Sequence, residues 1–237
     1  MQLTAAGEAL VTPARIIEAQ IAVVREIASA ASTGETGRVT VGFGGTGGYT
    51  VLSALTRSLA DSHPGIELEL RPQMYSGEVL DALRRGALDM GIVGLPIPRG
   101  FETHTVREET LMVAVPARHH LGTHDSVSPE DLATERFVMY PAEHGSVVRD
   151  ATLSVCATAG FTPTIARSPR SVQPVGHGRS GVGIAVVVES TAHLSMDGVV
   201  YLPIAGATPT LKIAMAWRPN NPTPAVHTVT RVLREQP

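Results

Sequence analysis

Hydrophobic and polar positions along the chain switch several times between two periodicities. Short apolar runs, some alternating with polar residues, are typical of strands, whereas apolar residues spaced three and four apart indicate helices. Glycine and proline residues separate the two kinds of segment. Strands are predicted at residues 38–43, 66–70, 90–93, 111–116, 137–140, 164–166, 183–188, 199–202 and 211–217. Helices are predicted at residues 4–32, 49–62, 78–85, 127–133, 147–159 and 225–235.

The order of these segments predicts an α/β fold. Strands and helices alternate from residue 38 to residue 93, which implies a mostly parallel sheet with right-handed crossovers. A second α/β series begins at residue 111, and the last strand and helix return to pack on the first series. We therefore expect two Rossmann-like lobes with a ligand cleft between them.

The first helix carries a further pattern. Thr4 suits the N-cap position, and Thr33-Gly34 suits the end of the helix. Apolar residues recur at alternating spacings of four and three, as in the seam of a coiled coil, so we expect this helix to dimerise. An amphipathic helix lying on its own domain is the alternative, and Pro13 should bend or weaken the first turns. The seam consists of Leu10, Ala14, Ile17, Ile21, Val24, Ala28 and Ala31.

Composition and charge narrow the possible functions. Of the 237 residues, 43% are hydrophobic, which is sufficient for one large or two small folded domains. The net charge of -3 predicts that this chain alone binds DNA poorly. The single cysteine, Cys156, excludes an internal disulfide and fits a reducing compartment. Because the chain lacks a run of ~20 apolar residues and a signal-peptide layout, we expect a cytoplasmic protein without membrane association.

A glycine-rich turn follows the first predicted strand. Gly42, Gly44 and Gly47 have the spacing G-x-G-x-x-G, with Glu67 and Glu69 about twenty residues further on, which resembles a dinucleotide-binding fingerprint. Gly42 would lie inside the strand, however, and five glycines in this segment make a chance match easy. An enzyme that uses a dinucleotide is therefore kept only as a third alternative.

The same turn predicts an anion site that needs no nucleotide. Thr46, Gly47 and Gly48 stand at the amino end of the helix predicted at residues 49–62. Backbone amides and the helix dipole favour a negative charge there, and the Thr46 hydroxyl adds a donor. The turn is therefore a candidate site for a carboxylate.

Three further features give no support for a metal site or catalysis. His119, His120 and His124 lie in a polar loop, without a nearby cysteine or a helix that would place two of them on one face. The segment around Ser180 lacks the G-x-S-x-G spacing of a nucleophile elbow. Cys156 lies in an apolar helical stretch and fits a core position. We therefore expect no metal, no cofactor and no enzyme activity.

Several segments, taken in order, resemble one protein family. Residues 3–10, LTAAGEAL, resemble the L-T-x-A-G-x-x-L sequence at which LysR-type transcriptional regulators pass from the wing of their helix-turn-helix into a linker helix. Residues 38–43, 63–68 and 83–92 are similar to the start of their effector domain. Shorter similar segments are residues 113–116, 119–121, 131–133, 159–163 and 181–185.

This resemblance implies a type-2 periplasmic-binding-protein fold, in which two α/β lobes joined by two crossover strands bind a small effector. It divides the chain into the end of the wing with the dimerisation helix (residues 1–36), lobe I (37–110 and 209–237) and lobe II (111–208). It also implies a homodimer or tetramer that acts on promoter DNA through a winged helix-turn-helix, most of which is missing before residue 3.

The resemblance also implies effector-binding positions. Thr46 and Gly47, with Gly48 beside them, stand where the family offers a hydroxyl and amides to an acidic effector. Ser76 stands where a second hydroxyl or amide contact is common. The remaining implied contacts are Gly94, Tyr140, Pro141, His144 and Gln173.

The chain departs from the family pattern at several of these positions. Some family members that respond to aromatic acids carry a basic side chain where this chain has Gly94, which argues against that ligand class. Pro174, Gly176 and Gly178 interrupt a stretch that is normally helical, and Val188 replaces a usual proline.

These observations predict the effector-sensing and dimerising portion of a LysR-type transcriptional regulator, with a small organic acid as its effector. A solute-binding protein of a transport system, which has the same two-lobe fold, is the alternative. The missing signal peptide and the motif at residues 3–10 argue against that alternative.

Overall fold

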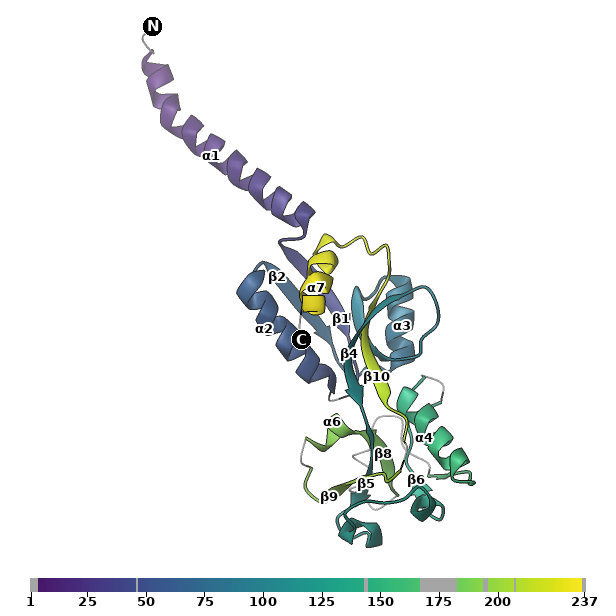
Figure 1. The fold of residues 1–237 in the computed structure, drawn as a ribbon. Coiled ribbons are helices and arrows are strands. Elements are labelled where there is room, and N and C mark those ends of the chain that lie inside the picture. Colours follow the sequence, from purple (N-terminus) through teal and green to yellow (C-terminus); the bar gives the residue numbers. More distant parts are fainter. Residues whose placement is uncertain are drawn as a thin grey trace. The chain divides into compact units, whose positions relative to one another are not determined.

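The computed structural model describes residues 4–45, 47–142, 145–166, 183–193, 196–206 and 208–235 (Figure 1). The chain forms two compact units, Met1–Val39 with Leu55–Glu69 and Asn221–Pro237, and Thr40–Ala54 with Leu70–Asn220. The helices are α1 (Ala5–Thr33), α2 (Gly47–Ser62), α3 (Ser76–Arg85), α4 (Val147–Thr158), α6 (Glu189–Ala192) and α7 (Pro224–Glu235). The strands are β1 (Gly37–Gly42), β2 (Ile66–Arg71), β3 (Met90–Gly94), β4 (Glu102–Glu109), β5 (Leu111–Pro116), β6 (Arg136–Phe137), β7 (Thr164–Ile165), β8 (Ala185–Val188), β9 (Val199–Pro203) and β10 (Leu211–Trp217).

Helix α1 begins and ends at the residues that the sequence predicts. Thr4 is the N-cap, and its hydroxyl accepts a hydrogen bond from the Gly7 amide at 3.2 Å. Gly34 ends the helix with a φ of 77°, a left-handed conformation that favours glycine. Pro13 lies inside the helix, which continues on both sides of it.

The predicted seam of α1 is open to solvent in this chain. Leu10, Ile17, Ile21 and Val24 are 49–65% exposed, and the three alanines of the seam are exposed as well. The alternative of a helix that buries this face against its own domain therefore does not hold. The exposed face extends over most of the helix and is available to another chain.

In the first unit, α7 packs against α1. The Thr228 hydroxyl donates a hydrogen bond of 3.0 Å to the carbonyl of Gly34, so the end of α1 is tied to the middle of α7. The predicted helix at residues 225–235 is confirmed and begins one residue earlier. Its buried apolar residues are Ala225, Val226, Val229, Val232 and Leu233.

A five-stranded sheet has the order β2-β1-β3-β10-β4. β1 and β3 run parallel, with Val41 opposite Met90. Helix α3 packs on β3, and Gly91 permits this close approach because a Cβ there would overlap the Val79 side chain. The alternation of strands and helices thus predicts this part of the sheet correctly.

Two further strands, β10 and β4, join this sheet in antiparallel pairs, which the alternation over residues 38–93 does not predict. β10 runs antiparallel to both β3 and β4. The sequence ETHTVREE of β4 contains one apolar residue and therefore gives no hydrophobic alternation to predict a strand. β4 is nevertheless paired along its length with β10 at the edge of the sheet, where polar side chains are tolerated.

A second, antiparallel sheet has the order β8-β5-β9, and β6 pairs with β7 in parallel. Helix α4 packs on β8. The two sheets with their helices form the mixed α/β architecture that the sequence predicts. The largest fully buried side chains of the core under the second sheet are Phe137, Leu132 and Ile184.

Two predicted elements of this region are shorter than expected. In place of a helix at residues 127–133 there is a 3₁₀ turn at Glu130–Leu132, because Val127 instead forms a β-bridge with Ile204. The strand predicted at residues 137–140 reduces to β6. None of the helices in the described ranges is long and apolar enough to cross a membrane.

Candidate functional site

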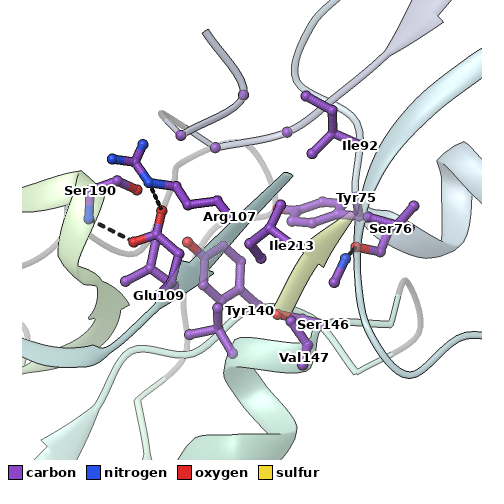
Figure 2. Close-up of a pocket in the computed structure, with 18 of the residues that line it drawn as sticks. Tyr75, Ser76, Ile92, Arg107, Glu109, Tyr140, Ser146, Val147, Ser190 and Ile213 are labelled. Carbon is purple, nitrogen blue, oxygen red and sulfur yellow. Dashed lines mark hydrogen bonds and ion pairs between the residues drawn. The ribbon is translucent and has the colours of Figure 1, made fainter. Parts of the chain in front are cut away.

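A pocket of about 120 Å³ lies in the second unit, and all of its lining residues in the described chain belong to that unit (Figure 2). It is lined by the turn between β1 and α2, the starts of α3 and α4, the ends of β3 and β4, and the junction of β8 with α6. Pockets for drug-sized ligands measure roughly 300–1,000 Å³. The smaller volume indicates a compact ligand.

Three helices begin at the wall of this pocket: α2 at Gly47, α3 at Ser76 and α4 at Val147. The first amides of a helix have no partner within it, and the helix dipole adds partial positive charge at the same end. The Ser76 hydroxyl accepts from the Gly94 amide at 3.4 Å, which leaves its own proton free to donate. The pocket therefore offers several groups that stabilise an anion.

Glu109, the last residue of β4, places a buried carboxylate in the pocket wall. Its side chain is 3% exposed, and its Oε1 lies 3.3 Å from Nε of Arg107. Its Oε2 accepts a hydrogen bond of 3.0 Å from the Ser190 amide (Figure 2). A Cβ on Gly47 would lie 3.2 Å from Oε1. The chain's own carboxylate thus stands beside the first residue of α2, where the sequence predicts an effector anion.

The hydroxyl of Ser190 lines the same part of the pocket. The residue is 6% exposed, and its Oγ has no hydrogen-bond partner among the residues that the structure describes. A Cβ on Gly47 would lie 3.0 Å from this oxygen. Oγ of Ser190 and Oε1 of Glu109 therefore both lie close to Gly47, where a side chain would crowd them.

Two tyrosines line the pocket with their rings edge to face, at a centroid distance of 6.2 Å. Burial, with a smaller contribution from Tyr75, raises the pKa of Tyr140 to about 12. Burial and then the Glu78 carboxylate raise the pKa of Tyr75. Both phenols therefore keep their protons at neutral pH. Arg149 donates a hydrogen bond of 2.8 Å to the carbonyl of Tyr140 and so fixes the backbone of that residue.

The structure brings together five of the effector contacts that the sequence analysis names: Gly47, Gly48, Ser76, Gly94 and Tyr140. Pro141 is not among the residues that line the pocket. Thr46, His144 and Gln173 lie outside the described residues. The role of each as an effector contact stays a prediction.

The sequence analysis missed Arg107, Glu109 and Ser190. The two charged residues lie in β4, which has no hydrophobic pattern, and Ser190 lies in the short helix α6, which was not predicted. The only sequence signal for this ion pair is the position of Arg107 and Glu109 just before the apolar strand β5.

Gly94 stands where a basic side chain was considered, and the structure leaves no room for one. A Cβ on Gly94 would overlap Cγ1 of Val147 in the first turn of α4. We expect Gly94→Ala to lower the free energy of unfolding by about 1–3 kcal/mol, as for other overpacked sites. Urea unfolding measures this loss.

A double substitution tests the reason for that loss. Val147→Ala removes the methyl that the new Cβ would meet, so the pair Gly94→Ala and Val147→Ala should cost about 0.5–3 kcal/mol less than the sum of the two single substitutions. Additive losses would show that the contact between these residues is not the cause.

The glycines of the fingerprint-like motif have packing roles. Gly42 lies inside β1, and a Cβ there would overlap the Leu88 side chain. A Cβ on Gly44 would overlap the carbonyl of Met74. The acidic residues of the motif, Glu67 and Glu69, pair with Arg38 at 3.3 and 3.6 Å. The spacing is therefore explained without a dinucleotide.

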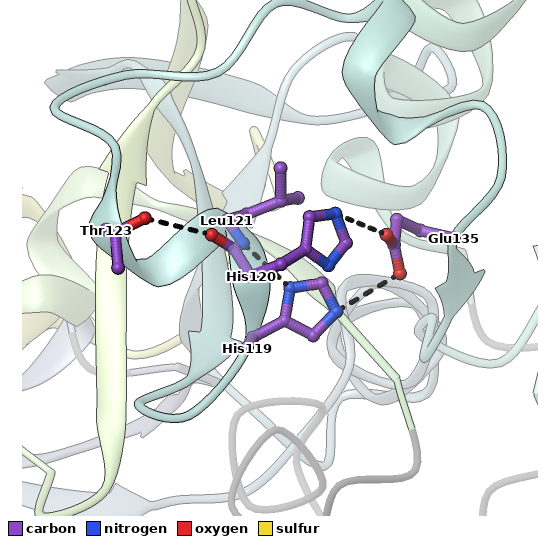
Figure 3. Close-up of polar contacts among 5 residues, drawn as sticks. All are labelled: His119, His120, Leu121, Thr123 and Glu135. Carbon is purple, nitrogen blue, oxygen red and sulfur yellow. Dashed lines mark hydrogen bonds and ion pairs between the residues drawn. The ribbon is translucent and has the colours of Figure 1, made fainter.

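Two of the three clustered histidines meet a carboxylate that the sequence analysis did not connect with them. Nε2 of His119 lies 3.2 Å from one Glu135 oxygen, and Nε2 of His120 lies 3.4 Å from the other (Figure 3). Nδ1 of His119 accepts from the Leu121 amide at 3.3 Å, so a neutral ring carries its proton on Nε2 and donates it to Glu135. This hydrogen bonding occupies the nitrogen that a metal ion would need.

Comparison with known proteins identifies the family of the chain. The family model of the LysR substrate binding domain matches residues 32–237. The chain belongs to the LysR family of transcriptional regulators. The HTH-type transcriptional regulator ShiR of Corynebacterium glutamicum (strain R) is 38% identical over 222 residues, which are 92% of this chain and 74% of ShiR. LysR-type regulation is thereby shown, and the alternative of a transport-system binding protein is not supported.

Solved LysR structures have the same fold. The LysR family regulator CbnR superimposes with a TM-score of 0.79 at 22% identity, over 98% of this chain and 81% of CbnR. The BenM effector binding domain with its effector benzoate gives 0.67 at 25% identity, over 84% and 90% of the two chains. The effector binding domain of QuiR in complex with shikimate gives 0.73 at 21% identity, over 84% and 95%. The described pocket therefore lies in a domain of the effector-binding LysR fold.

Proposed function

We propose that the protein senses a small organic acid in the pocket described above. Binding of the acid then changes how the regulator, of which this chain is the sensing part, acts at promoter DNA. The observation that carries this proposal is the convergence of two helix starts, at Ser76 and Val147, on one compact pocket. Each start favours negative charge, and the neutral phenols of Tyr75 and Tyr140 add donors. A carboxylate suits this set of groups.

Two structural relatives support an acidic effector. BenM is described with benzoate, and QuiR with shikimate. Both ligands are small carboxylic acids, in keeping with the pocket volume of about 120 Å³. We propose the same class of ligand, a small carboxylic acid, for the present chain, and we do not assign benzoate or shikimate to it.

The proposed mechanism is a shift in population between two arrangements of the lobes. An acid that binds one arrangement more tightly favours it, and the shift cannot exceed the difference in affinity. We propose lobe boundaries at residues 37–110 with 209–237 and at 111–208. In this scheme α1 joins two or four copies of the protein in the cytoplasm, and a helix-turn-helix outside residues 1–237 contacts DNA.

Ligand binding should stabilise the folded chain. At a concentration of about one hundred times Kd, an acid adds about 2.7 kcal/mol, which raises Tm by about 5–10 °C for a chain of this size. Thermal unfolding with a panel of small organic acids measures the shift. Ser76→Ala removes one donor from the pocket and should reduce the shift caused by the active acid.

A panel in which no acid raises Tm would contradict the proposal. Two unchanged responses to Ser76→Ala would also contradict it. One is the Tm shift that the acid causes in this chain, and the other is the response to the acid of a regulator that contains these residues together with a DNA-binding domain. Asp131→Ala provides a control, because this exposed carboxylate is bonded to Ser128 and does not line the pocket.

A further inference from the structure

We propose that Glu109 and Ser190 form a subsite for a hydroxyl group, so that the effector is a hydroxy acid. This inference rests on the organic-acid sensing proposed above and specifies the far end of the ligand. The two residues come from different elements, the end of β4 and the start of α6, and meet at the pocket wall beside Gly47.

The Ser190 hydroxyl supplies the first reason. It is buried, it lines the pocket, and it has no hydrogen-bond partner among the residues that the structure describes. Buried polar atoms almost always have a partner, and a missing one costs about 1–3 kcal/mol. A ligand in the pocket can supply this partner.

Glu109 supplies the second reason, because both of its carboxylate oxygens have a lone pair left to accept a further hydrogen bond. Oε2 accepts from the Ser190 amide, and Oε1 faces Nε of Arg107. Oε1 also faces the space beside Gly47, into which the Ser190 hydroxyl points. A group in this space can thus donate to Glu109 and accept from Ser190, which is what a hydroxyl does.

Charge excludes the two other common polar groups. A ligand carboxylate at this position would meet the like charge of Glu109 at close range. A ligand ammonium would meet a carboxylate whose charge Arg107 already balances, and it would stand beside the guanidinium. A neutral hydroxyl avoids both costs.

The same reasoning orients the ligand. Its carboxylate is directed to the starts of α3 and α4, at Ser76 and Val147, because the acidic residues in the first turns of these helices, Glu78 and Asp150, do not line the pocket. Its hydroxyl then lies at Glu109 and Ser190. Gly47 therefore lines the part of the pocket that holds the ligand hydroxyl, and α3 and α4 begin at the part that holds the ligand carboxylate.

Calorimetric titration of the chain with matched acids tests this assignment. The probes are benzoate, meta-hydroxybenzoate, meta-aminomethylbenzoate and shikimate. We expect at least one of the two hydroxy acids to bind about tenfold more tightly than benzoate, because a site built around a ligand hydroxyl rejects the analogue without it. In Ser190→Ala this preference should fall to about threefold or less.

Two variants separate the subsite from the rest of the pocket. Ser76→Ala should weaken benzoate and the hydroxy acids by a similar factor and keep the preference. Gly47→Ala places a methyl group in the space beside Glu109 and Ser190, so it should abolish the preference even if Ser190→Ala fails to fold. Thermal unfolding without ligand identifies the folded variants.

Each alternative outcome overturns the inference in a recognisable way. Equal affinities for benzoate and both hydroxy acids would remove the hydroxyl subsite while organic-acid sensing stands. If meta-aminomethylbenzoate binds most tightly, the subsite is one for an ammonium group and not for a hydroxyl. A preference that survives both Ser190→Ala and Gly47→Ala would place the hydroxyl elsewhere. Binding of none of the acids would refute the proposed sensing and the subsite with it.

Discussion

Replacement of both Ile17 and Ile21 by aspartate is expected to convert a dimer of this protein into monomers. These residues lie in consecutive seam positions of α1 and are 61% and 49% exposed in the single chain. In a two-stranded coiled coil each would be buried against the partner helix. Burial of one such side chain is worth about 1.5–3 kcal/mol, and a dimer would bury four.

The aspartates add an electrostatic cost to the lost burial. Four carboxylates would face one another across the seam, where like charges repel and lose water. Together these effects should raise the dimer dissociation constant at least about a thousandfold, which corresponds to about 4 kcal/mol. Sedimentation velocity and light scattering at several protein concentrations measure the change.

A single substitution outside the seam of the same helix provides the control. Ser29 is exposed and lies outside the seam, so Ser29→Asp should leave the mass of the particle unchanged. Circular dichroism shows whether both variants keep their helix content. A dimer that persists in the double aspartate variant would mean that the chain associates through another surface.

The long helix shows which parts of the fold follow from local sequence. Its N-cap Thr4, its terminal Gly34 and its seam all depend on residues within a few turns of one another, so sequence alone predicts them. The strands at 111–116 and 211–217 were predicted with their observed ends. The first is a continuous apolar run, and the second is apolar except at Lys212.

Elements that depend on distant pairing were not predictable in the same way. β4 is polar, and its position is set by pairing with β10, which lies about a hundred residues later in the sequence. Ser128 and Asp131 form reciprocal hydrogen bonds that begin a turn. That turn does not extend to a full helix, because Val127 is paired with Ile204 in a β-bridge.

The residues of the pocket also fall into those with a local sequence signal and those that meet only in the folded chain. Gly47 and Gly48 could be predicted because glycines at a helix start have local roles in binding anions, whereas Ser76 was predicted only from the family resemblance. Glu109 and Ser190 are 81 positions apart and meet only in the folded chain. Because Glu109 lies beside Gly47, the fold assigns the α2 start a different role from the one that its sequence indicates.

Phe137→Ala is expected to lower the free energy of unfolding by about 3–5 kcal/mol, as for other fully buried phenylalanines. Phe137 is 0% exposed and lies at the centre of the core under the second sheet. Its carbonyl accepts from the Ala166 amide at 2.8 Å, and the next residue, Val138, donates to the Ile184 carbonyl at 2.8 Å. A loss of this size is a large part of the 5–15 kcal/mol that stabilise a typical domain.

Phe161→Ala provides a matched control, because the two rings are 6.3 Å apart and Phe161 is only partly buried. Its replacement should cost roughly half as much, since the stabilisation follows the apolar area removed from water. Urea unfolding of both variants measures the difference.

Phe137 also precedes Tyr140 by three residues, so Phe137→Ala should additionally weaken the response of Tm to the active acid, whereas Phe161→Ala should not. Equal losses of stability and of response in the two variants would contradict the central position of Phe137 in this core.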